Sequence, residues 1–245
     1  MRLALVNARF TLVETVRIPI AMIGTVFFPA VTMIFFVVPF AGADPIGAAF
    51  ATASMVTMAV MTTNLFQYGI GIAEDRAQPW DPFTRTLPAG PGPRFAGRIL
   101  CGLLLTYVSL TPVVVIAAVW TEATVEPARL ALAAGTVVLI AVPFTLMGLT
   151  IGYALPSKAA IAVAQVLFFP LAFAGGLLSG PGQAPGWVEA IAPYVPTRGA
   201  VELMWASVGS FPVDPTAMIS LAGWTFGLAA AAVWAYRRDE GRRFR

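Results

Sequence analysis

Six long runs of apolar residues alternate with shorter polar segments along the chain. Each run exceeds 20 residues and contains no Asp, Glu, Lys or Arg. A helix needs about 20 residues to cross the roughly 30 Å hydrocarbon core of a bilayer, and these runs lack the alternation expected of membrane β-barrel strands. The pattern predicts six transmembrane helices, at Ile18–Phe40, Ile46–Ala73, Ile99–Trp120, Leu130–Leu155, Ala159–Ser179 and Thr216–Tyr236.

Composition supports an all-α polytopic membrane protein, with one transmembrane domain over residues 1–245. Hydrophobic residues make up 58% of the chain and charged residues 11%, whereas about a quarter of the residues are charged in a typical soluble domain. A water-soluble enzyme is therefore excluded. The chain has no histidine and one cysteine, Cys101, which removes His-based catalysis, a Cys/His zinc site and a disulfide framework. We expect no metal and no cofactor bound by this chain.

The distribution of basic residues predicts the orientation. With the N-terminus in the cytoplasm, 13 of the 15 basic residues fall in the inner segments, and only Arg129 and Arg198 fall outside. Basic residues concentrate on the cytoplasmic side of membrane proteins, so both termini are expected there. The basic tail over residues 237–245 is expected to face anionic lipid rather than nucleic acid. The first run is too long for the apolar region of a signal peptide, which favours an uncleaved first span.

The inner connection over residues 74–98 is one of two long loops. It opens with a charge cluster, and its aromatic and apolar residues then recur at near-helical spacing up to Pro88, which ends the short element. A short amphipathic helix of this kind suits docking of a cytosolic partner. It equally suits a helix lying on lipid headgroups. The candidate docking residues are Glu74, Asp75, Arg76, Trp80, Phe83, Arg85 and Leu87.

The outer connection over residues 180–215 is the second long loop. Its middle is too short and too interrupted by proline to span the membrane. We expect two short helices that are broken at Pro193–Pro196 and re-enter the outer leaflet, although a surface lid that only packs on the bundle also fits. The marker residues of this segment are Trp187, Pro193, Pro196 and Glu202.

The second predicted span is the most polar one. Its residues Thr57, Met61, Asn64 and Tyr68 follow helical spacing and so share one face. A cavity of amides, hydroxyls, Met and Phe would suit an apolar or amphipathic cargo, whereas the same groups could simply join helices by hydrogen bonds. The candidate substrate-path residues are Thr57, Met61, Asn64, Gln67, Tyr68, Gln165 and Phe168.

Three motifs, in order, resemble the transmembrane permease subunit of type-2 ABC exporters, most closely the drug-exporter branch. The first is Glu74-Asp75-Arg76 with Trp80 and Arg85-Thr86-Leu87-Pro88 after the second span. The second is Pro170 to Leu178 followed by Pro185-Gly186-Trp187. The third is Ala192-Pro193-Tyr194, Pro196-Thr197 and Val201-Glu202-Leu203 before the last span. The resemblance covers nearly the whole chain.

The resemblance implies an N-terminal interfacial helix over residues 1–17, a cytoplasmic coupling helix after the second span, and a re-entrant outer hairpin. It also implies a bacterial inner-membrane exporter for a hydrophobic or amphipathic substrate such as a drug or lipid. The prolines in Gln78-Pro79-Trp80-Asp81-Pro82 depart from the family pattern and displace the start of the coupling helix.

The energy source is expected to lie outside the chain. No phosphate-loop motif occurs in the sequence, so the chain is not itself the ATPase. The resemblance implies two copies of a separate nucleotide-binding subunit that bind ATP and Mg, and a second permease that is either identical or related.

An ion-coupled secondary transporter is the alternative function. No carboxylate lies within the six runs, which disfavours proton coupling through a buried acid. Sodium coupling through carbonyl and hydroxyl groups at broken helices remains open.

Overall fold

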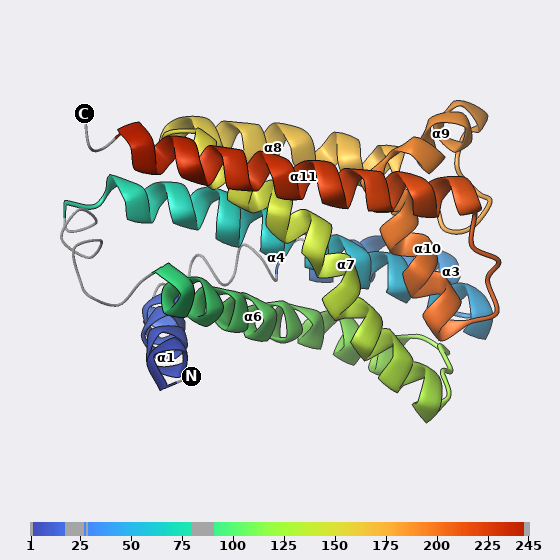
Figure 1. Cartoon of the computed structure of the whole chain (residues 1–245). Coiled ribbons are helices and arrows are strands. Elements are labelled where there is room, and N and C mark those ends of the chain that lie inside the picture. Colours follow the sequence, from blue (N-terminus) through green and yellow to red (C-terminus); the bar gives the residue numbers. More distant parts are fainter. Residues whose placement is uncertain (1, 18–26, 28, 80–90, 243–245) are drawn as a thin grey trace.

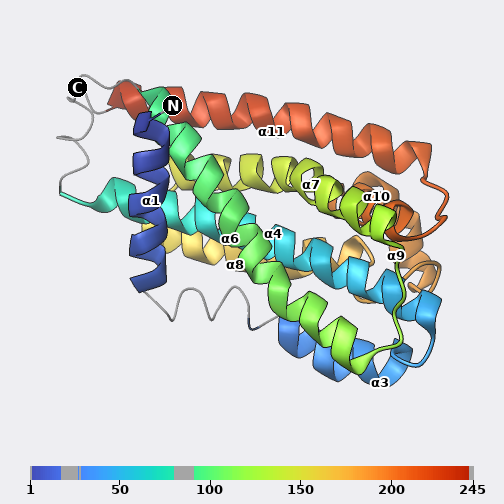
Figure 2. The same ribbon diagram turned by 90° about the horizontal axis from the view of Figure 1, so that it is seen from below.

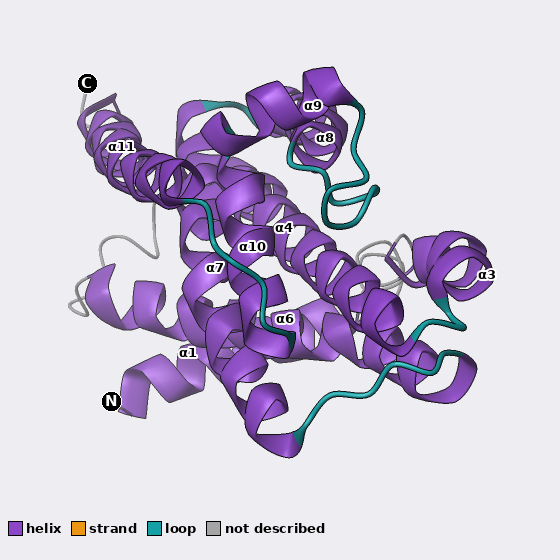
Figure 3. Ribbon diagram, turned by 90° about the vertical axis from the view of Figure 1, so that its right-hand side faces the viewer, coloured by secondary structure: helices purple, strands orange, loops and turns teal. Residues whose placement is uncertain are grey.

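The computed structural model describes residues 2–17, 27, 29–79 and 91–242. Every regular element among these residues is helical, and none is a strand (Figure 3). The all-α prediction is therefore confirmed for the described part of the chain. In chain order the elements are α1 (Arg2–Arg17), a π-helical turn (Met33–Val37), α3 (Val38–Ala41), α4 (Pro45–Ala77), α6 (Pro91–Trp120), α7 (Pro127–Ala154), α8 (Ser157–Ala174), α9 (Gly186–Ile191), a 3-10 turn (Ala192–Tyr194), α10 (Pro196–Val208) and α11 (Pro215–Arg242).

Five of the described helices are long and apolar enough to cross a membrane, namely α4, α6, α7, α8 and α11. They correspond to the last five predicted spans. Much of the first predicted span, Ile18–Phe40, lies outside the described residues. From Pro29 onward, its described residues belong to a shorter apolar helix, Pro29–Ala41, which includes the π-helical turn and Pro39. The described residues therefore contain five of the six predicted spans as candidate membrane helices, and the count of six is not confirmed.

Several helix ends differ from the ends of the predicted apolar runs. Helix α4 continues past the predicted Ala73 to Ala77, and α6 begins at Pro91 instead of Ile99. A helix can continue with charged residues beyond the hydrocarbon core of the membrane. Both helices are therefore longer than the apolar runs that predict them. Helix α8 instead stops at Ala174, short of the predicted Ser179, because Gly176 adopts a φ of +73°, a left-handed conformation that favours glycine.

The long helices form an antiparallel bundle (Figure 1). Helices α4, α7 and α11 end, and α6 and α8 begin, at one end, which we call the Arg76 end. Helices α9 and α10 lie at the opposite end, which we call the Arg198 end. Helix α1 packs against α6 and runs across the bundle direction at the Arg76 end (Figure 2). The orientation predicted from basic residues would put the Arg76 end in the cytoplasm.

Helix α4 is the centre of the bundle. Of an 18-residue apolar stretch in each helix, 72% is buried in α4, compared with 39% in α6 and α7, 22% in α8 and 17% in α11. Asp44 caps its first turn, because the Asp44 carboxylate accepts hydrogen bonds from the backbone N–H groups of Ile46 (3.2 Å) and Gly47 (2.9 Å). Helices α6, α7, α8 and α10 all pack against α4.

Small residues allow α7 to approach α4 closely. A Cβ built on Gly148 would lie 2.8 Å from the carbonyl oxygen of Asn64, and one on Gly152 would lie 2.5 Å from the carbonyl oxygen of Tyr68. Both distances are shorter than any real Cβ contact, so the two glycines are required for this approach. This is the packing that a Gly-x-x-x-Gly pair permits between membrane helices.

Candidate functional site

Among the described residues of the Arg76 end, two ion pairs flank the predicted coupling loop. Asp75, in the last turn of α4, pairs with Arg98 in α6. These two residues stand at the two ends of the loop, so their ion pair closes its base. Both side chains remain partly exposed, as expected at an interface with water.

Arg76 makes the second set of contacts and joins three helices. Its Nε lies 3.1 Å from Oδ1 of Asp239 in α11, and its Nη2 also contacts that oxygen. Its Nη1 donates to the carbonyl oxygens of Gly152 (2.6 Å) and Leu155 (3.2 Å), at the end of α7. The last carbonyls of a helix lack intrahelical partners and carry partial negative charge, so a guanidinium is well placed there.

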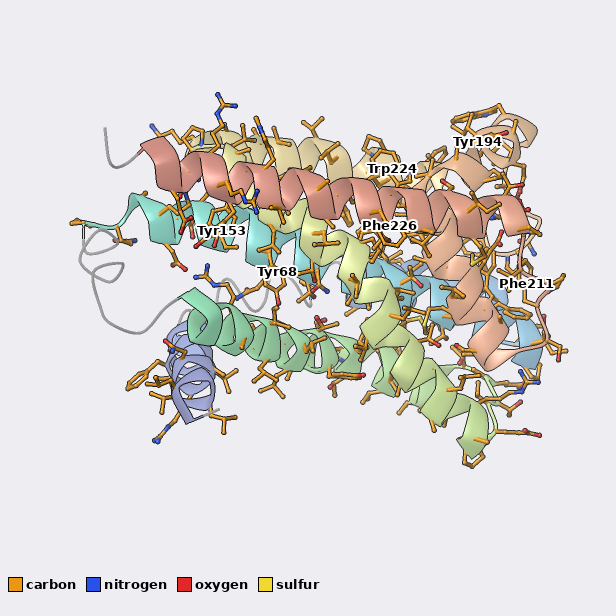
Figure 4. The ribbon with its side chains drawn as sticks, in the orientation of Figure 1. Tyr68, Tyr153, Tyr194, Phe211, Trp224 and Phe226 are labelled. Carbon is orange, nitrogen blue, oxygen red and sulfur yellow. The ribbon has the colours of Figure 1, made fainter. Side chains whose placement is uncertain are left out.

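An aromatic pair lies beside Arg76. The guanidinium carbon lies 5.9 Å from the ring centroid of Tyr153, and that ring meets Tyr236 of α11 edge to face at 5.2 Å. The hydroxyl of Tyr236 donates to Glu240 at 2.5 Å. Tyr153 lies at the Arg76 end (Figure 4). The two ring contacts add to the joint between α4, α7 and α11, whereas the Tyr236–Glu240 bond lies within α11.

The remaining candidate docking residues divide into two groups. Glu74 is exposed at the end of α4. The other four, Trp80, Phe83, Arg85 and Leu87, lie outside the described residues. The predicted docking residues thus include two, Asp75 and Arg76, that form ion pairs within the chain.

Four of the predicted substrate-path residues lie inside the packing of this one chain. Thr57, Met61, Asn64 and Tyr68 are each at most 1% exposed. Asn64 connects three helices: its Nδ2 donates to Thr106 of α6 at 3.1 Å, and its Oδ1 accepts from Thr145 of α7 at 2.9 Å. This arrangement corresponds to the interhelical hydrogen bonding that was the alternative interpretation of these residues.

Neighbouring polar groups on α4 make further hydrogen bonds, and together with those of Asn64 they form what we call the Asn64 seam. Thr63 donates to Ser109 of α6 at 2.9 Å. The Tyr68 side chain points from α4 toward α6 (Figure 4), where its hydroxyl donates to the carbonyl oxygen of Arg98 at 3.3 Å. Thr57 donates to the carbonyl oxygen of Ala53 in its own helix. Every one of these groups is satisfied within the chain.

The other three substrate-path residues are placed differently. Gln165 on α8 is exposed, and Gln67 on α4 is half-buried. Phe168 is buried and packs against Phe66 of α4, with ring centroids 6.0 Å apart. The structure therefore does not bring the seven candidates to one surface. Gln67 and Gln165 are the two whose side chains are accessible.

The Arg198 end contains a buried ionic cluster in and around α10. Nε of Arg198 lies 2.6 Å from Oε1 of Glu202, and Nη2 lies 3.3 Å from Glu189 of α9. Oε2 of Glu202 accepts the backbone N–H of Asp214 at 2.8 Å. Glu202 is 2% exposed and Arg198 is 8% exposed. The cluster ties α9, α10 and the segment before α11 together.

The outer segment consists of two short helices with a 3-10 turn between them. Pro193 lies within that turn and Pro196 begins α10, where proline is well tolerated. Trp187 in α9 is 60% exposed and stacks on Phe173 of α8, with centroids 5.8 Å apart. Helix α10 packs against α4, α7, α8 and α11.

Three residues with structural roles were not recognised from the sequence. Arg198 has a detectable signal, since it stands four residues before Glu202 on a helix. Trp205 is fully buried and donates its indole N–H to Phe50 and Ser54 of α4, which apolar patterning alone does not reveal. Asp239 lies in a basic segment and pairs across 163 positions, without a local signal.

Among the described residues, no group of three or more His, Cys, Asp or Glu side chains is placed to hold a metal ion. The chemistry of this part of the chain is that of ion pairs and hydrogen bonds at the two ends of a helical bundle.

Comparison with known proteins places the chain in a family. A family model described as "ABC-2 type transporter" matches residues 2–208. A relative from Bacillus subtilis (strain 168), named "Putative transport permease YvfS", is 23% identical over 155 residues. That alignment covers 62% of this chain and 63% of the relative, so the chain spans less than two thirds of the relative's length. Membrane domains of this family carry no ATPase motif and generally pair with nucleotide-binding subunits. Because the family model covers most of the sequence, the chain belongs to the ABC-2 type transporter family, as a multi-pass membrane subunit.

Proposed function

We propose that this chain is the membrane-spanning subunit of an ATP-driven bacterial exporter for hydrophobic or amphipathic compounds such as drugs or lipids. Two nucleotide-binding subunits would bind ATP and Mg and dock on the coupling loop. A second permease, identical or related, would complete the translocation path. The family membership supports the transporter class, and the export direction and the cargo class belong to the proposal.

The construction of the Arg76 end is the observation that carries the proposal. The Asp75–Arg98 ion pair holds the base of the loop to α6, and Arg76 holds the adjacent turn to α7 and α11. A movement imposed on the loop would therefore reach four helices at once. This is what a subunit that is driven from the cytoplasm requires.

Cargo would contact accessible polar and aromatic groups rather than the buried, hydrogen-bonded residues of the Asn64 seam. Gln67 on α4 and Gln165 on α8 are the accessible amides among the candidates. Helices α4 and α8 pack against each other. An uncharged surface with a few amides suits an apolar or amphipathic compound, because it offers hydrogen bonds without requiring a charge on the cargo.

ATP-driven transport in proteoliposomes tests the proposal. The chain is reconstituted with and without a candidate phosphate-loop ATPase subunit of its own organism, and the movement of doxorubicin, ethidium and a fluorescent phosphatidylethanolamine is followed with and without ATP. We expect movement of at least one compound that requires both ATP and the ATPase. Transport that is driven by a sodium gradient without the ATPase would contradict the proposal and favour a secondary transporter.

Substitution in the coupling loop tests the docking assignment. Charged residues at two apolar positions, Trp80→Asp and Phe83→Asp, should abolish stimulation of ATP hydrolysis while leaving membrane insertion intact. Trp120→Asp is the matched control, since Trp120 is a 54% exposed tryptophan at the other end of the bundle. Unchanged ATPase stimulation in the loop variants would remove the loop from the docking surface.

A further inference from the structure

We propose that Asp239 is a positioning residue for ATP coupling, which links α11 to the turn of α4 that precedes the coupling loop. The inference rests on the proposed function and extends it to a part of the chain beyond residues 2–208, the range that the family model matches. Asp239 lies near the end of α11, in a segment whose sequence suggests only a basic membrane-facing tail.

The geometry singles out Asp239 among the charged residues at this end. Its side chain is 5% exposed, and its Oδ1 accepts hydrogen bonds from Nε and Nη2 of Arg76. The neighbouring acid on α11, Glu240, bonds instead to Tyr236 of its own helix. Arg237 and Arg238 are exposed. Asp239 is thus the α11 side chain that makes the ion pair with α4 in the described structure.

Different nitrogens of Arg76 contact α7 and α11, so the contact with Asp239 can be removed without removing the contact with α7. A guanidinium presents several N–H groups in a rigid plane. Here Nη1 faces the terminal carbonyls of α7, while Nε and Nη2 face Asp239. Loss of the Asp239 charge leaves Arg76 bound at the negative end of α7. The α4–α7 joint then persists, and the α4–α11 joint is weakened selectively.

The consequence concerns transmission rather than assembly. Helix α11 runs the length of the bundle beside α7 and also packs against α10 at the Arg198 end (Figures 1 and 2). A movement of the coupling loop would reach α11 directly through the Arg76–Asp239 ion pair, and otherwise only indirectly, through the packing of α11 against α7. Asp239 supplies the direct connection.

The variant Asp239→Asn in the reconstituted complex tests the inference, with Asp239→Glu as the conservative variant and Glu240→Gln as the matched control. ATP hydrolysis and transport are measured together, using whichever compound of the doxorubicin, ethidium and phosphatidylethanolamine panel the wild type moves fastest. We expect transport per ATP hydrolysed to fall about fivefold or more in Asp239→Asn, within the usual range of coupling energies. Asp239→Glu should recover most of it, and Glu240→Gln should match the wild type.

Thermal unfolding of each variant separates positioning from a merely structural role. We expect Asp239→Asn to keep its bound ATPase and to unfold close to the wild-type temperature. Wild-type transport per ATP in Asp239→Asn would overturn the inference alone. So would a parallel loss of ATP hydrolysis, transport and thermal stability. A wild-type complex without ATP-driven transport would overturn the proposed function, and this inference with it.

Discussion

Gly148 of α7 lies against Asn64 of α4 with no space for a side chain between the two helices. A Cβ at Gly148 would lie 2.8 Å from the carbonyl oxygen of Asn64 and 2.8 Å from Cβ of Tyr68. Both neighbours belong to the most buried helix of the bundle. The two helices can therefore lie this close together only because residue 148 is a glycine and has no side chain.

Gly148→Ala is expected to destabilise the bundle, because the extra methyl group must push α7 away from α4. Overpacking of this kind costs about 1–3 kcal/mol, and thermal unfolding in detergent should shift to a lower temperature by several degrees. Gly135→Ala is the matched control on the same helix, since a Cβ there would meet nothing within 4 Å. Equal unfolding temperatures for the two variants would show that the close approach is wrong.

Asn64→Ala and Gln165→Ala are expected to have opposite phenotypes. Asn64→Ala removes the partner of Thr106 and Thr145, and interhelical hydrogen bonds in membranes contribute about 1 kcal/mol each. Its expression, thermal stability and transport should fall together. Gln165→Ala should leave stability unchanged and alter the relative transport of doxorubicin, ethidium and the fluorescent lipid. If Asn64→Ala kept wild-type stability but changed the relative transport of the three compounds, the prediction would be contradicted, and Asn64 would be a substrate-path residue.

The hydrophobic pattern predicted the all-α class and the positions of the five candidate spans in the described residues, because burial in lipid imposes a minimum length on every span. It did not predict the ends equally well. The turns around Arg76 and Arg98 are helical although they are charged, since a helix outside the hydrocarbon is not limited to apolar residues. The early end of α8 depends on the left-handed conformation of Gly176, which a run of apolar residues cannot reveal.

Which way a helix face points could not be predicted from one sequence. Helical spacing puts Thr57, Asn64 and Tyr68 on one side of α4, but the same spacing fits a face turned to cargo and a face turned to α6 and α7. The outcome depends on partners far away in the sequence, such as Thr145. The pairing of Arg76 with Asp239 was missed for the same reason, whereas Arg198 and Glu202 stand one helical turn apart and could have been paired.

Trp205→Phe tests how α10 is fixed to α4. The indole N–H of Trp205 donates to the carbonyl oxygen of Phe50 (3.1 Å) and to the hydroxyl of Ser54 (3.0 Å). Phenylalanine keeps much of the aromatic packing against Phe211 but leaves these polar groups without the donor. We expect a loss of about 1 kcal/mol, seen as a lower unfolding temperature. Trp187→Phe should have no such effect, because Trp187 is largely exposed. Similar behaviour of the two variants would contradict the assigned role of the indole group.

Arg198→Leu is expected to be the most destabilising of these substitutions. It leaves the carboxylate of Glu202 buried without its cation, and breaking a buried ion pair from one side costs about 3–5 kcal/mol. The double variant Arg198→Leu with Glu202→Leu should recover part of the loss, because it removes the stranded charge as well. Arg129→Leu provides the control, since the hydrogen bond of Arg129 to Ser210 (3.3 Å) is exposed to solvent. Thermal unfolding of the four proteins completes the comparison. A double variant less stable than Arg198→Leu would mean that the Glu202 bond to the backbone of Asp214 matters more than the ion pair.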